Sequence, residues 1–233
     1  NSLITFNNPR IDNVLNAILE RNNDYLSSNE IAQGIVYPQD KLNKKNADKL
    51  GEGFNLNDGI FQLNESELKS LNLNEDEYSI VKPFYTTTEL NKYFGDRDNK
   101  EWILYTKSDI KYNIESYPNI KEHLDKYSEV ITSDNKPYGL HRARNEEFFK
   151  GEKIISLRKN YQPCFTYTDF DCYVSQTYFS IQTERLNQRY LTGLLNSNVF
   201  AFWLKYQGKM QGDLYQVDKE PLMNLPIINP TEE

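Results

Sequence analysis

Apolar and polar positions alternate most regularly in the segment Lys153–Arg158. Ile155 and Leu157 fall on one side of this segment and the polar residues around them fall on the other, which is the two-residue period of a β-strand. Glu101–Thr106 (EWILYT) is the strongest single strand pattern, because aromatic and aliphatic residues favoured in strands dominate it. Further strands are predicted at Ile60–Leu63, Ile80–Tyr85, Phe165–Thr168 and Tyr173–Gln182.

Helical periodicity begins near the N-terminus. Asn8 followed by Pro9 is typical of a helix start, because Asn caps the first turn and proline is tolerated at the first helical position. Apolar residues then recur at helical spacing, which predicts an amphipathic helix over Pro9–Asn22. Further helices are predicted at Asn64–Leu71, at Glu89–Phe94, from Pro118 to Ile131, at Leu186–Leu195 and at Ser197–Tyr206. The last two are apolar along most faces, so we expect them to pack against a sheet.

Three segments lack either pattern. Pro38–Gly59 is predicted to be a long surface loop, and Gly208–Gln216 a polar loop punctuated by glycine. Leu222–Ile228 is predicted to be extended, because Pro221 and Pro226 restrict its backbone. Together the elements predict an α+β fold, a mostly antiparallel twisted sheet flanked by helices. We expect residues 1–27 to form an N-terminal connector helix and residues 28–233 to form one domain.

The composition is that of a folded domain. Of 233 residues, 38% are hydrophobic, and 17 Tyr and 12 Phe indicate an aromatic-rich interior. No apolar run approaches the roughly 18 residues that a membrane-spanning helix needs. The chain starts without Met or a leader, so we expect a piece of a larger cytoplasmic protein. The two cysteines, Cys164 and Cys172, are predicted to be reduced.

Charge is distributed unevenly along the chain. The net charge of -7 argues against an indiscriminate nucleic-acid binder. Acidic residues are concentrated before residue 134, however, whereas residues 134–190 carry a small excess of Lys and Arg. Basic, amide and aromatic side chains at strand ends in this region suit contacts with base edges and phosphates. A solvated sheet edge explains the same residues as well.

The DNA-binding interpretation assigns roles by side-chain chemistry. We predict that Arg142, Arg144 and Arg158 contact guanine edges and that Gln162 contacts adenine. Lys159 and Lys209 are predicted to contact phosphates. The remaining predicted DNA-binding residues are Lys136, Tyr138, His141, Tyr161, Lys205, Gln211, Tyr215 and Gln216.

No catalytic or metal-binding pattern was found in the sequence. A nucleotide or S-adenosylmethionine site of the Rossmann type would need a glycine-rich strand-to-helix turn, which the sequence lacks. His123 is predicted to be a packed, hydrogen-bonded core residue rather than a zinc ligand. The acid-x-Lys triplets at Glu67 and Asp109 lack the preceding carboxylate of a nuclease site. We therefore predict no catalytic residue, metal or cofactor in this chain.

Several ordered segments resemble those of a known family. They are Ile80–Phe84 (IVKPF), Trp102–Thr106 (WILYT), Tyr117–Leu124 (YPNIKEHL), Lys153–Ile155, Tyr173-Val174 with Tyr178–Ile181, Leu191–Ser197 (LTGLLNS) and Leu225–Ile227. This set resembles the TaqI-like C-terminal specificity domain, the target-recognition domain of adenine-N6 DNA methyltransferases and fused type IIG restriction-modification enzymes. Thr86–Glu89 replaces the basic turn usual in the family, so no contact is carried over from that turn.

The resemblance implies a fold and a set of partners. The fold would be similar to the target-recognition domains of type I restriction specificity subunits, and residues 28–233 would recognise double-stranded DNA. An upstream methyltransferase domain of the same polypeptide would use S-adenosylmethionine, with or without a fused type II endonuclease. The rival prediction is a protein-interaction module that docks through the aromatic helix near residues 200–206, which the net acidity favours. Salt dependence of binding separates the two.

Overall fold

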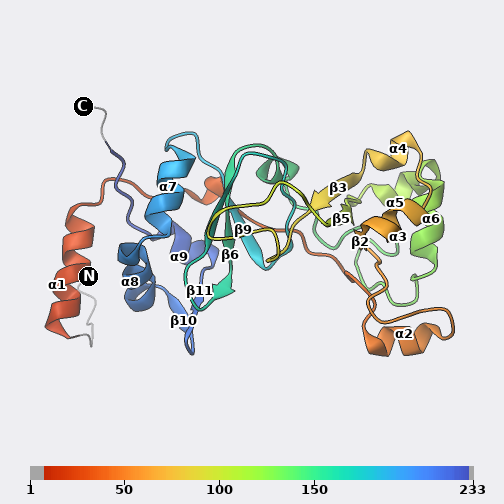
Figure 1. The fold of residues 1–233 in the computed structure, drawn as a ribbon, viewed down its shortest axis with the longest axis horizontal. Helices are drawn as coiled ribbons and strands as arrows, with labels where there is room; N and C mark the ends of the chain where they lie inside the picture. The colour runs from red at the N-terminus through yellow and green to blue at the C-terminus, as the bar shows by residue number, and fades with distance from the viewer. Residues whose placement is uncertain (1–7, 231–233) are drawn as a thin grey trace.

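A sheet of five strands lies at the centre of the molecule (Figure 1). The computed structural model describes residues 8–230. The order across this sheet is β1 (Ile31–Gln33), β9 (Tyr178–Ile181), β6 (Lys153–Leu157), β8 (Phe165–Thr168) and β4 (Tyr93–Phe94). Neighbouring strands are antiparallel except β8 and β4, which are parallel. The predicted α+β class, with mostly antiparallel strands flanked by helices, is confirmed.

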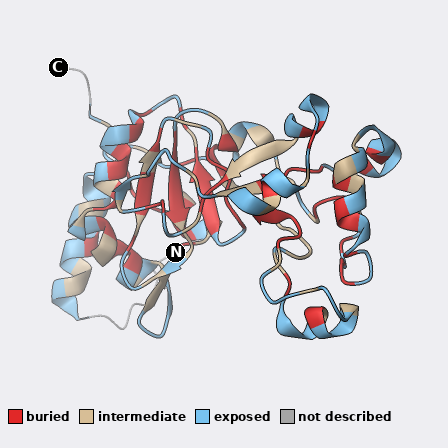
Figure 2. Ribbon diagram, turned by 45° about the vertical axis from the view of Figure 1, so that its right-hand side comes forward, coloured by how far each residue is buried: buried red, intermediate tan, exposed pale blue. Residues whose placement is uncertain are grey.

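The inner strands β6 and β9 of the central sheet are buried on both faces, and Figure 2 shows the middle of the sheet largely in red, whereas β4 at its edge is exposed. Because side chains alternate along a strand, Ile154 and Ile155 of β6 point to opposite faces. Ile154 packs into a cluster with the C-terminal helices, whereas Ile155 and Leu157 pack into the cluster on the other side. The central sheet therefore lies between two hydrophobic cores.

Helices cover one face of the central sheet. α7 (Gln188–Leu195), α8 (Asn198–Gln207) and α9 (Lys219–Met223) form this layer, and α1 (Pro9–Glu20) lies outermost, at the left of Figure 1. Asn187 caps α7 and Ser197 caps α8, each accepting from a backbone N–H of the first turn. The predicted helices Pro9–Asn22, Leu186–Leu195 and Ser197–Tyr206 are confirmed, with ends shifted by one or two residues.

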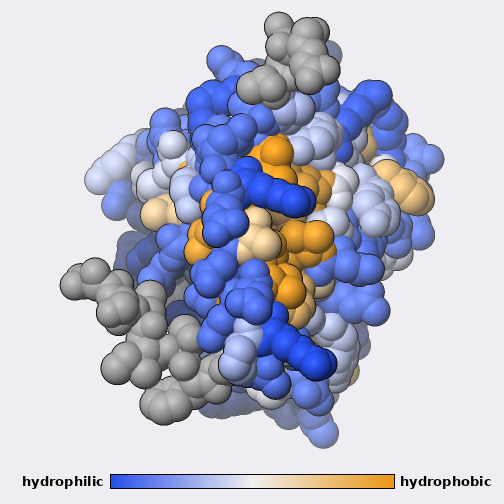
Figure 3. All heavy atoms as spheres, turned by 90° about the vertical axis from the view of Figure 1, so that its left-hand side faces the viewer, coloured by the Kyte–Doolittle hydropathy of each residue, from blue (hydrophilic) through white to orange (hydrophobic). Residues whose placement is uncertain are grey.

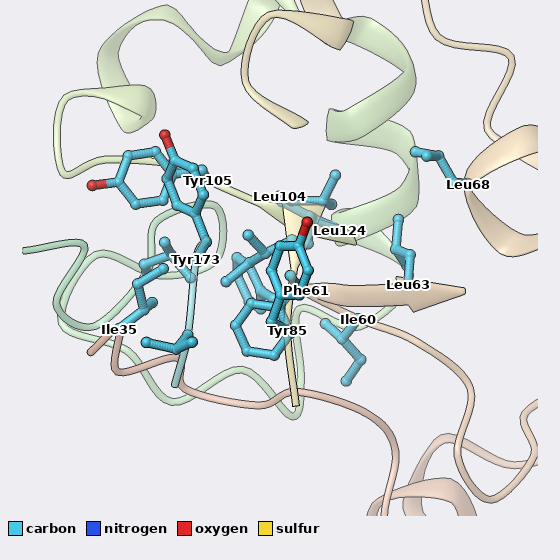
Figure 4. Packing of buried hydrophobic residues seen from close by; sticks show 14 of the residues in the cluster. Ile35, Ile60, Phe61, Leu63, Leu68, Tyr85, Leu104, Tyr105, Leu124 and Tyr173 are labelled. Carbon is cyan, nitrogen blue, oxygen red and sulfur yellow. The ribbon is translucent and has the colours of Figure 1, made fainter. Parts of the chain in front are cut away.

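A second lobe forms the right of Figure 1. It contains a three-stranded antiparallel sheet in the order β2 (Gln62–Asn64), β5 (Glu101–Leu104) and β3 (Val81–Phe84). Its helices are α2 (Lys44–Leu50), α3 (Glu65–Ser70), α4 (Glu75–Tyr78), α5 (Ile110–Asn113) and α6 (Pro118–Asp125). Figure 4 shows Phe61, Leu104 and Leu124 packed beside Tyr105 and Tyr173 in the core of this lobe.

A buried carboxylate joins two helices of the second lobe. Glu77 is fully buried and follows the start of α4. It accepts hydrogen bonds from the backbone N–H groups of Asn74, Asn119 and Ile120 and from the side-chain amide of Asn119. Burial opposes its ionisation, but the hydrogen bonds from Asn119 and the backbone hold the pKa of Glu77 below its usual value. The carboxylate thus ties α4 to the start of α6.

A clasp joins the segment after α1 to the domain. The Arg185 guanidinium donates to both carboxylate oxygens of Asp24 at 2.7 Å and to both oxygens of Glu30 at 2.8 and 2.9 Å. The N–H of Asp24 also donates to the carbonyl of Ile227, and the N–H of Ile227 donates back to Asp24. The chain that leads from α1 into β1 is therefore fixed to the C-terminal part of the domain.

The predicted loop Gly208–Gln216 is wrong. Residues Lys209–Gln211 (β10) and Leu214–Gln216 (β11) form a hairpin, and β11 pairs with β7 (Lys159–Asn160) to make a third sheet. Gly212 lies at the turn with φ of 60°, a left-handed conformation that glycine adopts without steric cost. A two-residue Gly-Asp connection is a hairpin signal, so the sequence contained the information.

Other predicted elements also differ from the structure. The helix predicted at Glu89–Phe94 does not form, because Glu89 is buried and caps the turn by accepting from Thr86, and Tyr93 then starts β4. The loop predicted at Pro38–Gly59 contains α2, capped by Asn43. Smaller differences concern element bounds. The strand predicted at Tyr173–Gln182 is reduced to β9, and the helix predicted from Pro118 ends at Asp125. Leu222 and Met223 of the predicted extended segment belong to α9, and the strand predicted from Ile60 begins at Gln62 as β2.

Two predictions about individual residues and one about membrane-spanning helices can be compared with the structure. His123 is buried, and its Nε2 lies 2.9 Å from the carbonyl oxygen of Ile60, so the packed histidine is confirmed. Cys172 is buried and Cys164 half-buried, and neither forms a disulfide. Within residues 8–230, no helix is long and apolar enough to cross a membrane.

Candidate nucleic-acid interface

Three polar side chains lie in a row across the small sheet β10–β11–β7. Lys209 pairs with Gln216, and Gln216 pairs with Lys159 on the next strand. Directly opposed residues of antiparallel strands share a face, so these three side chains, hereafter the polar row, project from one side of the sheet. Gln211, two residues after Lys209, projects from the same side. Lys159, Lys209 and Gln211 are exposed.

Tyr215 lies on the other face of the small sheet. It pairs with Asn160 and Met210, one residue out of step with the polar row. Its ring packs against the core beneath α7, α8 and α9, and the residue is half-buried. The structure therefore places the predicted Tyr215 behind the polar row and not within it.

Arg158 directly precedes the small sheet, and its backbone is fixed on both sides. Its N–H donates to the carbonyl of Thr177 at 2.9 Å, and its carbonyl accepts from the N–H of Val217 at 2.8 Å. Its side-chain Nε donates to Asp218 Oδ1 at 2.5 Å, and Gln216 Nε2 donates to the other Asp218 oxygen at 2.5 Å. Burial opposes ionisation of Asp218, but the hydrogen bonds from Arg158 and Gln216 keep its pKa below the usual value.

Two open hollows meet at Arg158. The first has a volume of about 530 Å³, and the second about 540 Å³. The polar residues that line the first hollow are Gln33, Arg144, Asn145, Arg158, Asp218, Lys219 and Glu220. The second hollow is lined by Thr87, Leu157, Arg158, Lys159, Gln176 and Thr177. Arg158 thus lines both hollows, and Lys159 of the polar row lines the second.

Arg144 lines the first hollow but is held by the protein. Its Nε donates to the carbonyl of Gly34 at 3.2 Å, and its Nη2 donates to Gln33 Oε1 at 2.8 Å. Burial, and then the nearby charge of Arg142, lower the pKa of Arg144. Arg142 itself is exposed, and its backbone pairs with Val36. Of the three predicted guanine-reading arginines, Arg144 and Arg158 therefore line the first hollow, whereas Arg142 lies near Arg144 and lines neither hollow.

Other predicted residues lie elsewhere or follow β7. Tyr138 donates from its hydroxyl to Asp125 of α6 at 2.8 Å, and burial together with this carboxylate raises the pKa of Tyr138 to about 12. His141 lies 3.9 Å from Asp134, and Lys136 is exposed in the same segment. This segment packs against the second lobe, not against the small sheet. Tyr161 and Gln162 follow β7 and are exposed.

Lys159, Lys205 and Lys209 around the small sheet form no ion pair with the described residues, although the charge of Lys209 contributes to the lowered pKa of Asp218. In the described part of the chain, neither Lys159 nor Lys209 has a carboxylate oxygen within 4.0 Å, and the same holds for Lys205 at the end of α8. The Lys205 ammonium instead lies 5.7 Å from the ring centre of Tyr206. Unpaired ammonium groups beside exposed amides are suited to a polyanion that presents hydrogen-bonding edges.

Sequence reasoning missed several polar residues of this region. Gln33, Asn145, Gln176 and Thr177 enter the hollows from segments that carry no charge pattern or motif. Asp218 was missed because an acidic residue is not expected on a surface that meets phosphates. Across the described residues, no group of three His, Cys, Asp or Glu side chains could hold a metal ion.

A separate apolar face lies at the α1 end of the molecule (Figure 3). A groove of about 510 Å³ separates α1 from α8 and the C-terminal segment. Its apolar lining includes Val14, Ile18, Val199, Phe200 and Ile228, of which Val14, Val199 and Ile228 are exposed. This face differs in chemistry from the small sheet, since it offers contact area and few hydrogen-bonding groups.

Comparisons with known proteins give a family match and a similar solved structure. A family model described as the TaqI-like C-terminal specificity domain matches residues 81–227. Among solved structures, the chain is similar to the type IIL restriction-modification enzyme MmeI in complex with DNA, with a TM-score of 0.55 and 14% sequence identity. That match covers 86% of this chain and 26% of the MmeI chain, so this chain spans about a quarter of that protein's length. No curated protein matches.

Proposed function

The chain belongs to the family of TaqI-like C-terminal specificity domains, and from this premise we propose that it recognises the sequence of double-stranded DNA within a restriction-modification enzyme. The observation that carries the proposal is the polar row, Lys209, Gln216 and Lys159, beside Arg158 and its two hollows. The major groove of B-DNA is wide enough to admit a two-stranded β-ribbon. The hairpin β10–β11 is such a ribbon, and it exposes Lys209 and Gln211 on the face of the polar row, beside Met210 on the other face and Asp213 at the turn.

In this proposal, different residues contact the phosphates and the bases. Lys159 and Lys209 neutralise phosphates and set the register of the domain on the duplex. Arg158, Gln211 and Gln162 carry the donors and acceptors that distinguish base pairs in the major groove. The net charge of -7 is compatible with this role, because only one surface of the domain meets DNA and a neighbouring domain completes the grip.

The proposal extends to the rest of the polypeptide. An upstream adenine-N6 methyltransferase domain, with or without an endonuclease, would use S-adenosylmethionine, and this chain would position it on the DNA without performing catalysis. Residues 1–27 would form the connector to that domain and residues 28–233 the recognition domain. Residues 1–7 lie outside the described residues, and the Arg185 clasp supports a fixed connection after α1. The whole enzyme would act in the cytoplasm, on cellular or invading DNA.

A second candidate function is docking of a protein partner, and the apolar groove beside α8 favours it (Figure 3). The predicted docking residues 200–206 are largely used internally, however. Phe200, Trp203 and Leu204 are buried in the core of the domain itself, and Phe202 packs on Tyr206 with ring centres 4.7 Å apart. The aromatic residues of α8 therefore support the domain, and DNA recognition is the better supported function.

The test is the salt dependence of DNA binding by the full-length protein. We expect Lys159→Ala combined with Lys209→Ala to weaken binding to a mixed-sequence duplex and to reduce the slope of log affinity against log salt by about 2, roughly 1 for each phosphate contact. Lys44→Ala combined with Lys45→Ala is the matched control, since it removes two exposed lysines from α2 in the second lobe.

The control variant should retain the wild-type slope. Wild-type binding that does not change with salt would contradict DNA recognition itself. Equal effects of the two double variants would instead contradict the assignment of the small sheet.

A further inference from the structure

Two arginines line the first hollow, and the protein holds them differently. Arg144 donates from Nε and Nη2 to protein acceptors, so one of its four terminal N–H donors is already used. Arg158 donates from Nε alone, to Asp218. Among residues 8–230, the terminal Nη1 and Nη2 of Arg158 have no hydrogen-bond partner. Arg158 therefore keeps all four terminal N–H donors for a ligand, and donors paired on Nη1 and Nη2 match the O6 and N7 acceptors of guanine.

Asp218 is itself held on both oxygens. One oxygen accepts from Arg158 and the other accepts from Gln216. Gln216 belongs to β11 of the small sheet and pairs with Lys159. The side chain of Asp218 is 17% exposed, whereas that of Arg158 is 37% exposed. The less exposed carboxylate of Asp218 thus binds Nε of Arg158, and the two terminal nitrogens of the guanidinium have no partner among the described residues. Such an arrangement fixes the plane and direction of the two terminal donors.

We propose that Asp218 is a positioning residue that aims Arg158 at a guanine edge, with Gln216 holding Asp218 in place. The inference rests on the proposed function and deepens it, because it assigns one arginine to a base and names the residues that orient it. A carboxylate near DNA repels phosphates, so we expect Asp218 to contribute to binding in another way, which is to orient Arg158. Fastening β11 to β7 does not require it, since the N–H of Val217 already bonds to the carbonyl of Arg158.

The experiment uses the full-length protein and a preferred duplex selected from a randomised DNA pool. At the base pair that Arg158 reads, wild type should prefer guanine by about 5- to 150-fold. Asp218→Ala should reduce this preference to less than threefold, without lowering affinity for a duplex that lacks the preferred sequence. Asp218→Asn keeps an oxygen that can accept from Arg158, so it should recover part of the preference. Glu220→Ala is the matched control, because it removes another acidic residue of the same hollow.

A base analogue separates positioning from a general structural role. Replacing the guanine with 7-deazaguanine removes the N7 acceptor without changing the shape of the duplex. In wild type and in Glu220→Ala this replacement should weaken binding, whereas in Asp218→Ala it should have no further effect, which is the non-additivity expected of one shared interaction.

Two outcomes would overturn the inference: full guanine preference in Asp218→Ala, or an equal loss of affinity for all duplexes with the 7-deazaguanine effect intact. Failure of the proposed function would look different, because wild type would then select no sequence at all.

Discussion

Replacing Glu77 with alanine is expected to lower the free energy of unfolding by about 3 kcal/mol. The carboxylate is fully buried and accepts four hydrogen bonds from Asn74, Asn119 and Ile120. Its removal leaves those donors without acceptors at the junction of α4 and α6. Equilibrium unfolding in denaturant, followed by circular dichroism, measures the change.

The matched control for this prediction is Glu75→Ala. Glu75 lies in the same short helix but is exposed, so its replacement should change the free energy of unfolding by less than about 0.5 kcal/mol. Glu77→Gln keeps the shape of the side chain and removes the charge. Because the pKa of Glu77 is lowered on folding, its contribution is full above its ordinary pKa of 4.5 and is lost as the pH falls below that value.

The stability difference between wild type and Glu77→Gln should therefore shrink as the solution is acidified from neutral pH. Equal stability of Glu77→Ala and Glu75→Ala would show that the buried carboxylate does not hold the second lobe together.

The second large effect is expected in DNA binding. Arg158→Ala should weaken binding of the full-length protein to its preferred duplex by about 1–3 kcal/mol and should abolish preference at one base pair. The reason is the loss of two donors from a fixed position beside the polar row. Competition binding against single-base variants of the preferred duplex measures both quantities.

Arg21→Ala serves as the control for this change, since Arg21 is an exposed arginine at the end of α1 and away from the small sheet. It should leave the preference at every base pair unchanged. A uniform loss of affinity in Arg158→Ala, with the preference intact, would reduce Arg158 to a phosphate contact.

Much of the fold follows from local sequence signals. Asn8 before Pro9 marks the start of α1, and Ser197 marks the start of α8, because each cap satisfies backbone donors of its own first turn. The strand β8 forms over the predicted residues. The two helix starts depend on neighbouring residues alone, whereas β8 also needs its pairing with β6 and β4. The division of the strands into three sheets was not predictable, because it depends on pairings between distant segments.

The least predictable elements are set by tertiary contacts. The segment after Thr86 has helical caps and polar residues, yet the buried Glu89 closes a turn and Tyr93 pairs in parallel with Thr166 of β8. The hairpin β10–β11 carries a turn signal at Gly212-Asp213, but its strands show no apolar alternation, and its third strand lies about fifty residues earlier in the chain. Pairing with β7 selects this conformation over a loop.

The sequence predicted which types of residue form the candidate interface, but it did not predict how they are arranged in space. Lys159, Lys209, Gln211 and Gln216 were proposed from chemistry, and the strand register places their side chains on one face. The same register puts Tyr215 on the opposite face of the small sheet. A shift of β11 by one residue would instead place Tyr215 on the face of the polar row. The relation of Asp218 to Arg158 required the pairing of segments about sixty residues apart and had no signal in the sequence.

The central claim is that DNA lies against the small sheet, and photo-crosslinking tests it most directly. A benzophenone side chain is placed at Tyr161 in one variant of the full-length protein and at Tyr112 in another. The two tyrosines are 72% and 83% exposed, and Tyr112 belongs to α5 in the second lobe. With a mixed-sequence duplex at low salt, irradiation should produce a protein–DNA adduct from position 161 and little from position 112. An adduct from position 112 alone, or equal yields from both, would contradict this placement of DNA.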